Sequence, residues 1–201
     1  MNEEPFRTLD GPAASEFTIR GSRFIGRVAP VEDVDAAEAL VEHTREEYDD
    51  ATHVVPAYRV RTGDGMLREY ANDDGEPSGS AGEPMLNALR GRELENVAAA
   101  VVRYYGGTNL GVGGLVRAYG RAVADALDGA EVIERRPHRP LAVEVAYDDS
   151  GTVRGILDSA GAEFEADYGE AVRFEASVPV GELAELRDRL LSATGGRADL
   201  E

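Results

Sequence analysis

The chain contains 201 residues, of which 42% are hydrophobic, so it can bury a sizeable core in one large or two small domains. Its formal net charge of −18 comes from 39 acidic residues against 21 arginines, and no lysine occurs. The absence of cysteine excludes disulfides, thiolate catalysis and cysteine-based zinc sites, and no apolar run approaches the ~20 residues of a membrane span. The acidic first ten residues lack the apolar core of a signal peptide, so we expect a cytoplasmic protein without a membrane partner.

The acidic charge has two interpretations. A mimic of nucleic acid would concentrate its carboxylates, whereas adaptation to molar intracellular salt would disperse them over the surface. Residues 1–127 carry 22 acidic and 13 basic residues and residues 128–201 carry 17 and 8, so each part has a net charge of −9. This even distribution favours salt adaptation and a halophilic source. The Debye length at such salt falls to ~3 Å, so net charge does not exclude nucleic-acid binding.

The chain opens with a pattern of mixed strands and helix. Residues 1–15 lack periodicity and predict an irregular lead-in. Residues 16–29 alternate as a strand, with a break at Gly21 that indicates a hairpin or bulge. Apolar residues at helical spacing over 34–48 predict an amphipathic helix that packs on the sheet.

A second pair of strands follows this helix. Residues 52–61 alternate as a strand, and Pro56 within it predicts a position near a sheet edge or a bulge, because proline donates no ladder hydrogen bond. Residues 62–65 predict a turn into a short antiparallel strand over 66–71.

Two helices flank an apolar strand in the next segment. Ser80 to Glu83 has capping-box spacing, although Pro84 can instead occupy the first helical position with Glu83 as the cap, and Gly91 ends this helix. Residues 97–102 are apolar without alternation, which is typical of a central strand covered on both faces. Residues 113–128 predict a helix with a broad buried face.

The proline-rich basic stretch 135–140 predicts a linker between a first domain, residues 1–134, and a second domain, residues 141–201. The second domain has the element order of a ferredoxin-like split βαβ fold, so the fold class is α+β. Its expected elements are strand 141–147, helix 151–160, strand 162–168, strand 171–178, helix 181–194 and strand 197–200.

A glycine-rich turn separates the apolar strand from the following helix. Its amides, next to a helix start, suit an anion, although a tight strand-to-helix turn explains the glycines equally well. A nucleotide P-loop needs a lysine that this chain lacks, and the dinucleotide fingerprint needs glycine where Val116 stands, so no nucleotide cofactor is expected. The candidate glycines are Gly106, Gly107, Gly111, Gly113 and Gly114.

No acidic residue occurs between Asn96 and Ala124, a window that contains Arg103, Arg117 and Arg121. These arginines are candidates for phosphate contacts beside the glycine loop. The competing interpretation is that a buried strand and a tight turn exclude acids anyway, with Arg121 pairing with its helical neighbour Asp125.

An acidic turn is the candidate catalytic constellation. Asp73, Asp74 and Glu76, with His53, could hold a divalent cation or exchange protons. The alternative is that the aspartates cap a turn, and this structural interpretation is favoured, so no metal site is expected.

Two segments, DDGEPSGSAGEPML at 73–86 and VVRYYGGTNLGVGGLVRAYGRAV at 101–123, resemble the signature of the IMPACT/YigZ family. The resemblance extends over roughly residues 20–127. It implies a first domain similar to the second domain of ribosomal protein S5 and a ferredoxin-like second domain similar to one in translocation GTPases. Eukaryotic members of the family are linked to translational control in starvation.

The resemblance and the arginines together suggest a non-enzymatic, translation-associated regulatory factor that binds RNA, the ribosome or a protein of the translation machinery. One alternative is a metal-dependent enzyme acting on a phosphorylated or nucleotide substrate. A second alternative is a protein-interaction module.

Overall fold

The computed structural model describes residues 4–62 and 66–201, so most of the turn expected at 62–65 lies outside the described residues. The chain separates into two compact units, one built from Phe6–Arg135 and one from Arg136–Glu201. Each unit combines an antiparallel sheet with helices, so the protein has a mixed α/β fold in two domains.

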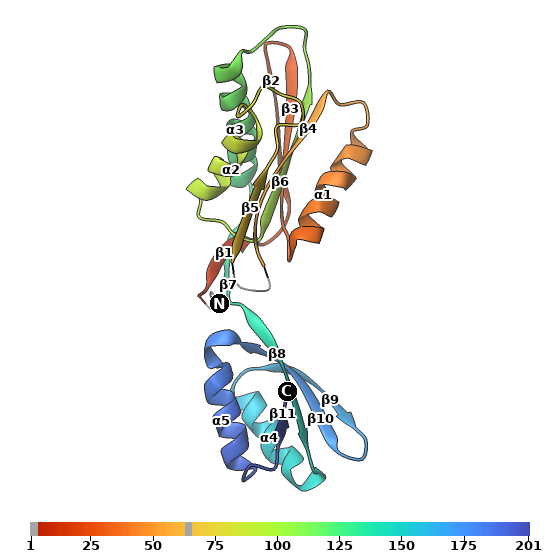
Figure 1. Ribbon diagram of the computed structural model, residues 1–201, viewed down its shortest axis with the longest axis vertical. Coiled ribbons are helices and arrows are strands. Elements are labelled where there is room, and N and C mark those ends of the chain that lie inside the picture. Colours follow the sequence, from red (N-terminus) through yellow and green to blue (C-terminus); the bar gives the residue numbers. More distant parts are fainter. Residues whose placement is uncertain (1–3, 63–65) are drawn as a thin grey trace. The chain divides into compact units, whose positions relative to one another are not determined.

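The first unit is organised on a five-stranded antiparallel sheet with the order β2-β3-β6-β4-β5 (Figure 1). β6 lies at its centre, as the apolar run predicted. The strands are β2 (Ala13–Ile19), β3 (Ser22–Pro30), β4 (His53–Arg61), β5 (Leu67–Ala71) and β6 (Val97–Tyr104).

Helices cover both faces of this sheet. α1 (Val34–Glu47) packs on one face, and α2 (Gly82–Gly91) and α3 (Val112–Asp128) pack on the other (Figure 1). β6 is buried on both faces because its alternate side chains enter the two cores, Val101 on the side of α2 and α3 and Ala98 on the side of α1. Among the described residues, no helix has the combined length and apolar character of a bilayer span.

β2 and β3 form the hairpin that the break at Gly21 predicted. Arg20 and Gly21 make its two-residue turn with φ of 49° and 83°. Positive φ at both positions is the geometry of a type I′ turn, whose twist matches that of the flanking strands.

Pro56 predicted a position near a sheet edge or a bulge, and β4 lies next to the edge strand β5, between it and the central strand β6. Pro56 faces the point where the β5 ladder ends: its carbonyl accepts from the amide of Asn72 at 3.3 Å, and β5 itself stops at Ala71. An internal strand tolerates proline here because the missing amide falls where the neighbouring chain leaves the sheet.

The irregular lead-in expected over residues 1–15 is wrong for its described part. β1 (Phe6–Leu9) pairs antiparallel with β7 (Val132–Arg135), and Leu9 is fully buried. A four-residue strand whose partner lies at the far end of the domain leaves no local periodicity to detect.

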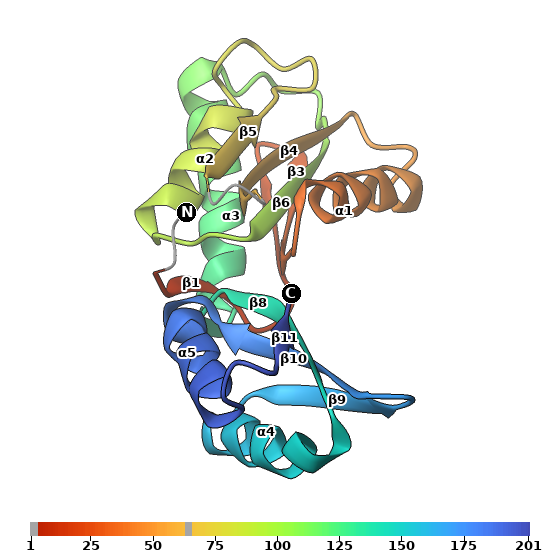
Figure 2. The same ribbon diagram turned by 60° about the horizontal axis from the view of Figure 1, so that its bottom comes forward.

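The second unit has the strand order β11-β8-β10-β9, with α4 and α5 side by side on one face (Figure 2). This is the predicted split βαβ arrangement. β8 starts earlier than expected, so the linker predicted at 135–140 shortens to Arg136 and Pro137. The likenesses to ribosomal protein S5 and to a translocation GTPase stay predictions. The elements are β8 (His138–Val145), α4 (Tyr147–Ser159), β9 (Glu163–Tyr168), β10 (Val172–Pro179), the 3-10 turn η1 (Val180–Glu182), α5 (Leu183–Ala193) and β11 (Asp199–Leu200).

Candidate functional site

Asp73 holds the acidic turn against the start of α2. One carboxylate oxygen accepts from the amides of Ala81 and Gly82 at 3.0 and 2.9 Å, and the other accepts from Gly79 at 2.7 Å. Both caps proposed from the sequence are wrong, since α2 begins at Gly82 after an N-cap, Ala81, that supplies no side-chain bond. A carboxylate from outside the helix satisfies the amides instead, where the helix dipole also favours negative charge.

We expect Asp73→Asn to destabilise the protein by roughly 2–4 kcal/mol, because the amide nitrogen would face a backbone N–H donor. Burial alone would raise the pKa of Asp73, but the three backbone hydrogen bonds outweigh it and lower that pKa. The stabilisation is therefore complete above the unfolded pKa of about 4 and is lost as pH falls through the lower folded pKa. Urea titrations of both proteins from neutral to acidic pH measure this.

Asp49→Asn is the matched control for that substitution, because Asp49 is an exposed residue of the turn after α1. It should leave the midpoint of urea unfolding unchanged. A difference between Asp73→Asn and the parent that persisted undiminished at the acidic end would contradict the role given to the carboxylate.

Asp74 ties the same turn to β4. Its carboxylate accepts from the amide of Val54 at 2.8 Å and lies 3.5 Å from Arg45. Its backbone has a positive φ of 48°, which the 2.7 Å bond from its amide to the Asn72 side chain supports. With Asp73 and Asp74 engaged by backbone amides, these contacts favour the turn-capping interpretation. Among the described residues, no three His, Asp or Glu side chains converge as a metal site would require.

His53 joins the turn to the interior. Its Nδ1 lies 2.6 Å from the carbonyl oxygen of Asp74, and a carbonyl can only accept, so Nδ1 carries a proton. Nε2 then points into the domain, 3.9 Å from the carboxylate of Glu76. The sequence grouped His53 with this turn, and the structure brings the two together.

Glu76 differs from the two aspartates because its side chain is buried, with 4% exposed. One oxygen accepts from Nη1 of Arg103 at 2.5 Å and from the hydroxyl of Tyr119 at 2.6 Å. Burial raises the pKa of Tyr119 and the bond to Glu76 raises it further, so this hydroxyl stays protonated and donates. We call Glu76, Arg103, Tyr119 and His53 the buried cluster.

Arg103 is therefore largely buried rather than on the outer surface of the domain, and its role as a phosphate contact stays a prediction. It is 5% exposed, and the carbon of its guanidinium lies 5.5 Å from the ring centroid of Phe24 and 5.5 Å from that of Tyr105. Its Nε has no partner in the described part of the chain. A cavity of about 540 Å³ lies between the buried cluster and the start of α3 at Gly111.

The glycine loop has two kinds of glycine. Gly106 is structural: a Cβ there would lie 1.9 Å from the carbonyl carbon of Gly21, and its amide donates to Ser22 at 3.1 Å. Gly107 and Gly111 instead have positive φ, 80° and 71°, with open space where a Cβ would stand.

The start of α3 is partly uncapped. The amides of Gly114 and Leu115 donate to the carbonyl of Gly111, which satisfies them within the turn. Across the described residues, the amides of Val112 and Gly113 have no acceptor, and Gly111 supplies no side-chain cap. Two donors at the positive end of a helix thus remain for an external acceptor.

Arg117 and Arg121 line a groove of about 320 Å³ beside this loop. Arg117 folds back along α3, with Nη1 3.7 Å from where a Cβ of Gly113 would stand. Arg121 covers Phe17 at 4.3 Å and pairs with Asp125 at 3.0 Å, as the structural alternative anticipated.

Arg20 also lines the groove, and the sequence patterns did not identify it as a candidate site residue. It occupies the turn between β2 and β3, and nothing local connected that turn with a helix about a hundred residues later. In the described chain neither Arg20 nor Arg117 forms an ion pair. We define the arginine groove by its lining residues, none of which is acidic: Phe17, Ile19, Arg20, Leu110, Gly114, Arg117, Ala118 and Arg121.

These features define a two-domain α/β protein whose first domain carries a buried cluster, a glycine loop and an arginine groove. Two family models match it: Impact N-terminal domain over residues 20–127 and Domain of unknown function (DUF1949) over residues 143–197. The chain belongs to the IMPACT family, as the two sequence segments predicted.

Relatives cover both domains. IMPACT family member YvyE of Bacillus subtilis is 36% identical over 195 residues, which span 96% of this chain and 89% of that protein. IMPACT family member YigZ of Escherichia coli is 36% identical over 183 residues, 90% of each chain. A solved structure titled "Crystal structure of an hypothetical protein" has a TM-score of 0.76 and 33% identity, covering 98% of this chain and 96% of the other.

Proposed function

We propose that this protein is a translation-associated regulatory factor that binds structured RNA, such as ribosomal RNA, through the arginine groove and the adjoining glycine loop. The match of the Impact N-terminal domain supports the cellular role, because the resemblance to this family implies a link to translational control. One observation carries the molecular part: a chain with a net charge of −18 lines one groove with three arginines and no acid.

The arginine groove and the loop offer complementary contacts. Arg20 and Arg117 make no ion pair among the described residues and can each take a phosphate, whereas Arg121 is shared with Asp125. The amides of Val112 and Gly113 lie at the start of α3, where Nη1 of Arg117 is 3.7 Å from the position of a Cβ on Gly113, and they suit a further phosphate oxygen. Arg103 belongs to the buried cluster and contacts Phe24, whose ring stacks on Phe17 of the groove.

We expect Arg20→Gln with Arg117→Gln to weaken binding of ribosomal RNA uniformly across sequences. Each lost phosphate contact should reduce the slope of log affinity against log salt by about 0.7–0.9. Filter binding across a salt series measures both quantities. The slope distinguishes loss of phosphate contacts from loss of folded protein, which would reduce the active fraction and leave the slope unchanged.

Arg68→Gln with Arg92→Gln removes the same charge from positions outside the groove and should change neither quantity. Arg68 lies on β5, at the opposite edge of the sheet from β2. If the groove variant and this control bound RNA with equal affinity and equal slope, the assignment of RNA to the arginine groove would be wrong.

A further inference from the structure

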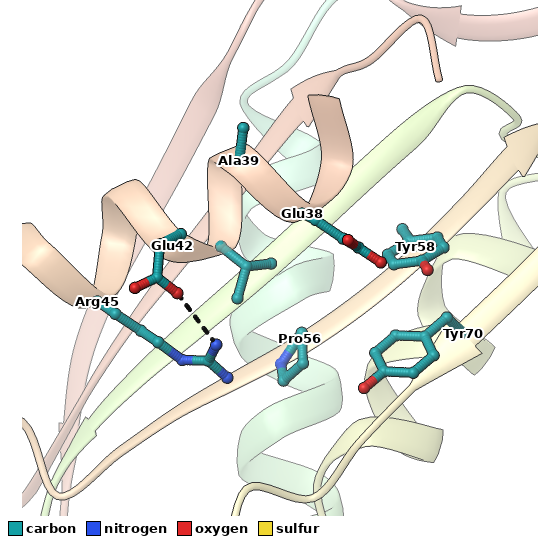
Figure 3. A pocket seen from close by; sticks show the side chains of 8 residues that line it. Glu38, Ala39, Glu42, Arg45, Pro56, Tyr58 and Tyr70 are labelled. Atoms are coloured by element: carbon teal, nitrogen blue, oxygen red, sulfur yellow. Dashed lines mark hydrogen bonds and ion pairs between the residues drawn. The ribbon is translucent and has the colours of Figure 1, made fainter. Parts of the chain in front are cut away.

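A further pocket lies on the other face of the same sheet, between α1 and the strands β4 and β5 (Figure 3). It has a volume of about 470 Å³, within the size range of sites for small ligands and single side chains. The residues that line it and carry chemistry are Glu38, Glu42, Arg45, Tyr58 and Tyr70. We call it the tyrosine pocket, and it shares no lining residue with the arginine groove.

An unsatisfied hydroxyl points to a ligand here. Tyr58 is 1% exposed, and its hydroxyl has no hydrogen-bond partner in the described structure. Buried polar atoms in folded proteins are nearly always paired, so an orphan that lines a cavity calls for an explanation. Burial raises the pKa of Tyr58, so the group is a neutral hydroxyl that can accept from a ligand donor.

The charge of the pocket selects a cation. Two carboxylates, Glu38 and Glu42, line it against one arginine, and Arg45 is already shared between Glu42 and Asp74 at 3.5 Å each. Glu38 forms no ion pair within the described residues, and Figure 3 shows its carboxylate turned toward Tyr58. A single unpaired carboxylate beside an orphan hydroxyl suits a group that has several N–H donors.

The two tyrosine rings of the pocket favour a guanidinium over other cations. Tyr58 and Tyr70 stack with their ring centroids 5.0 Å apart, and Tyr70 keeps 40% of its surface exposed beside the pocket. A flat guanidinium stacks on such a ring, pairs with a carboxylate and donates to a hydroxyl at once. A bare metal ion would require more oxygen ligands than the one free carboxylate and the one phenol hydroxyl of this pocket supply.

We infer that the tyrosine pocket binds an arginine side chain presented by a protein partner, with Glu38 as its counter-ion and the hydroxyl of Tyr58 as a second acceptor. This site acts independently of the arginine groove, because α1 and α3 cover opposite faces of the sheet. One domain can therefore hold RNA and a basic protein segment together.

Calorimetry of the full chain with the peptide acetyl-Gly-Arg-Gly-amide tests this inference. The citrulline peptide, an uncharged match of the same shape, should bind about tenfold more weakly, as should the arginine peptide to Glu38→Gln. Glu46→Gln, an exposed position of α1 outside the pocket, should bind like the parent. Equal binding of the arginine and citrulline peptides, or equal binding by parent and Glu38→Gln, would overturn the inference.

Tyr58→Phe distinguishes a binding role of the hydroxyl from a structural one, because the two roles predict different changes in melting temperature and peptide affinity. The ring stays, and removal of an unsatisfied buried hydroxyl should leave the melting temperature of the free protein equal or higher. The same variant should bind the arginine peptide several-fold more weakly, since one acceptor is lost. Unchanged peptide affinity would remove Tyr58 from the site, and equal affinity for a lysine peptide would refute the guanidinium assignment.

Discussion

Gly106→Ala is expected to destabilise the first domain by more than about 3 kcal/mol, or to prevent its folding. The new Cβ would lie 1.9 Å from the carbonyl carbon of Gly21 and 2.3 Å from the amide nitrogen of Ser22. These are backbone atoms of the β2–β3 turn, so no side-chain rotation relieves the clash, and the ends of β3 and β6 would have to separate. Urea unfolding followed by far-ultraviolet circular dichroism measures the loss.

Gly107→Ala is the matched control for this effect. Gly107 has a φ of 80°, which strains any residue with a Cβ, but a Cβ there would have nothing within 4 Å. Its cost should therefore stay near 1–2 kcal/mol, roughly that of left-handed backbone in an ordinary residue. Equal losses at the two positions would show that backbone conformation, rather than the close approach to Gly21, makes Gly106 necessary.

Removal of one partner of the buried ion pair is the other substitution with a large expected effect. Glu76→Ala should cost about 3–5 kcal/mol, because it leaves the guanidinium of Arg103 without its counter-charge at a site 5% exposed. The hydroxyl of Tyr119 also loses its acceptor, which lies 2.6 Å away in the parent. Chemical denaturation at neutral pH gives the value.

The double variant Glu76→Ala with Arg103→Met tests the cause of this loss. It removes both charges and fills the guanidinium site with an apolar chain, so it should recover part of the stability lost by Glu76→Ala alone. Tyr119→Phe, which removes only one hydrogen bond to the carboxylate, should cost about 1–2 kcal/mol. A double variant less stable than Glu76→Ala would show that the orphaned charge is not the dominant penalty.

Local patterns predicted most of the first domain. The unbroken apolar run of β6 identified the central strand, and the apolar stripe along α1 identified the helix that covers one face. Both patterns could be recognised because each lies within one short stretch of sequence. Contacts between residues far apart in the sequence could not be predicted from such local patterns. β1 was missed because its pairing partner, β7, follows it by more than a hundred residues.

The candidate site shows the same limit. The window free of acids around Arg103 and Arg121 suggested a surface of unpaired charge, yet both arginines have acidic partners outside that window, Glu76 and Asp125. The fold supplies Glu76 from 27 residues away in sequence. Absence of acids nearby in sequence thus identified Arg117 as free but could not distinguish it from Arg103. The halophilic source inferred from composition stays a prediction.

The pairing of β1 with β7 has a consequence for synthesis of the chain. Phe6 can pair with its partner only after Arg135 has been synthesised. The two-stranded sheet of β1 and β7 therefore forms only after the five-stranded sheet has been synthesised, and β1 keeps an open strand edge until then. Because this contact closes a long loop, we expect the pairing of β1 with β7 to be a late and slow step of folding.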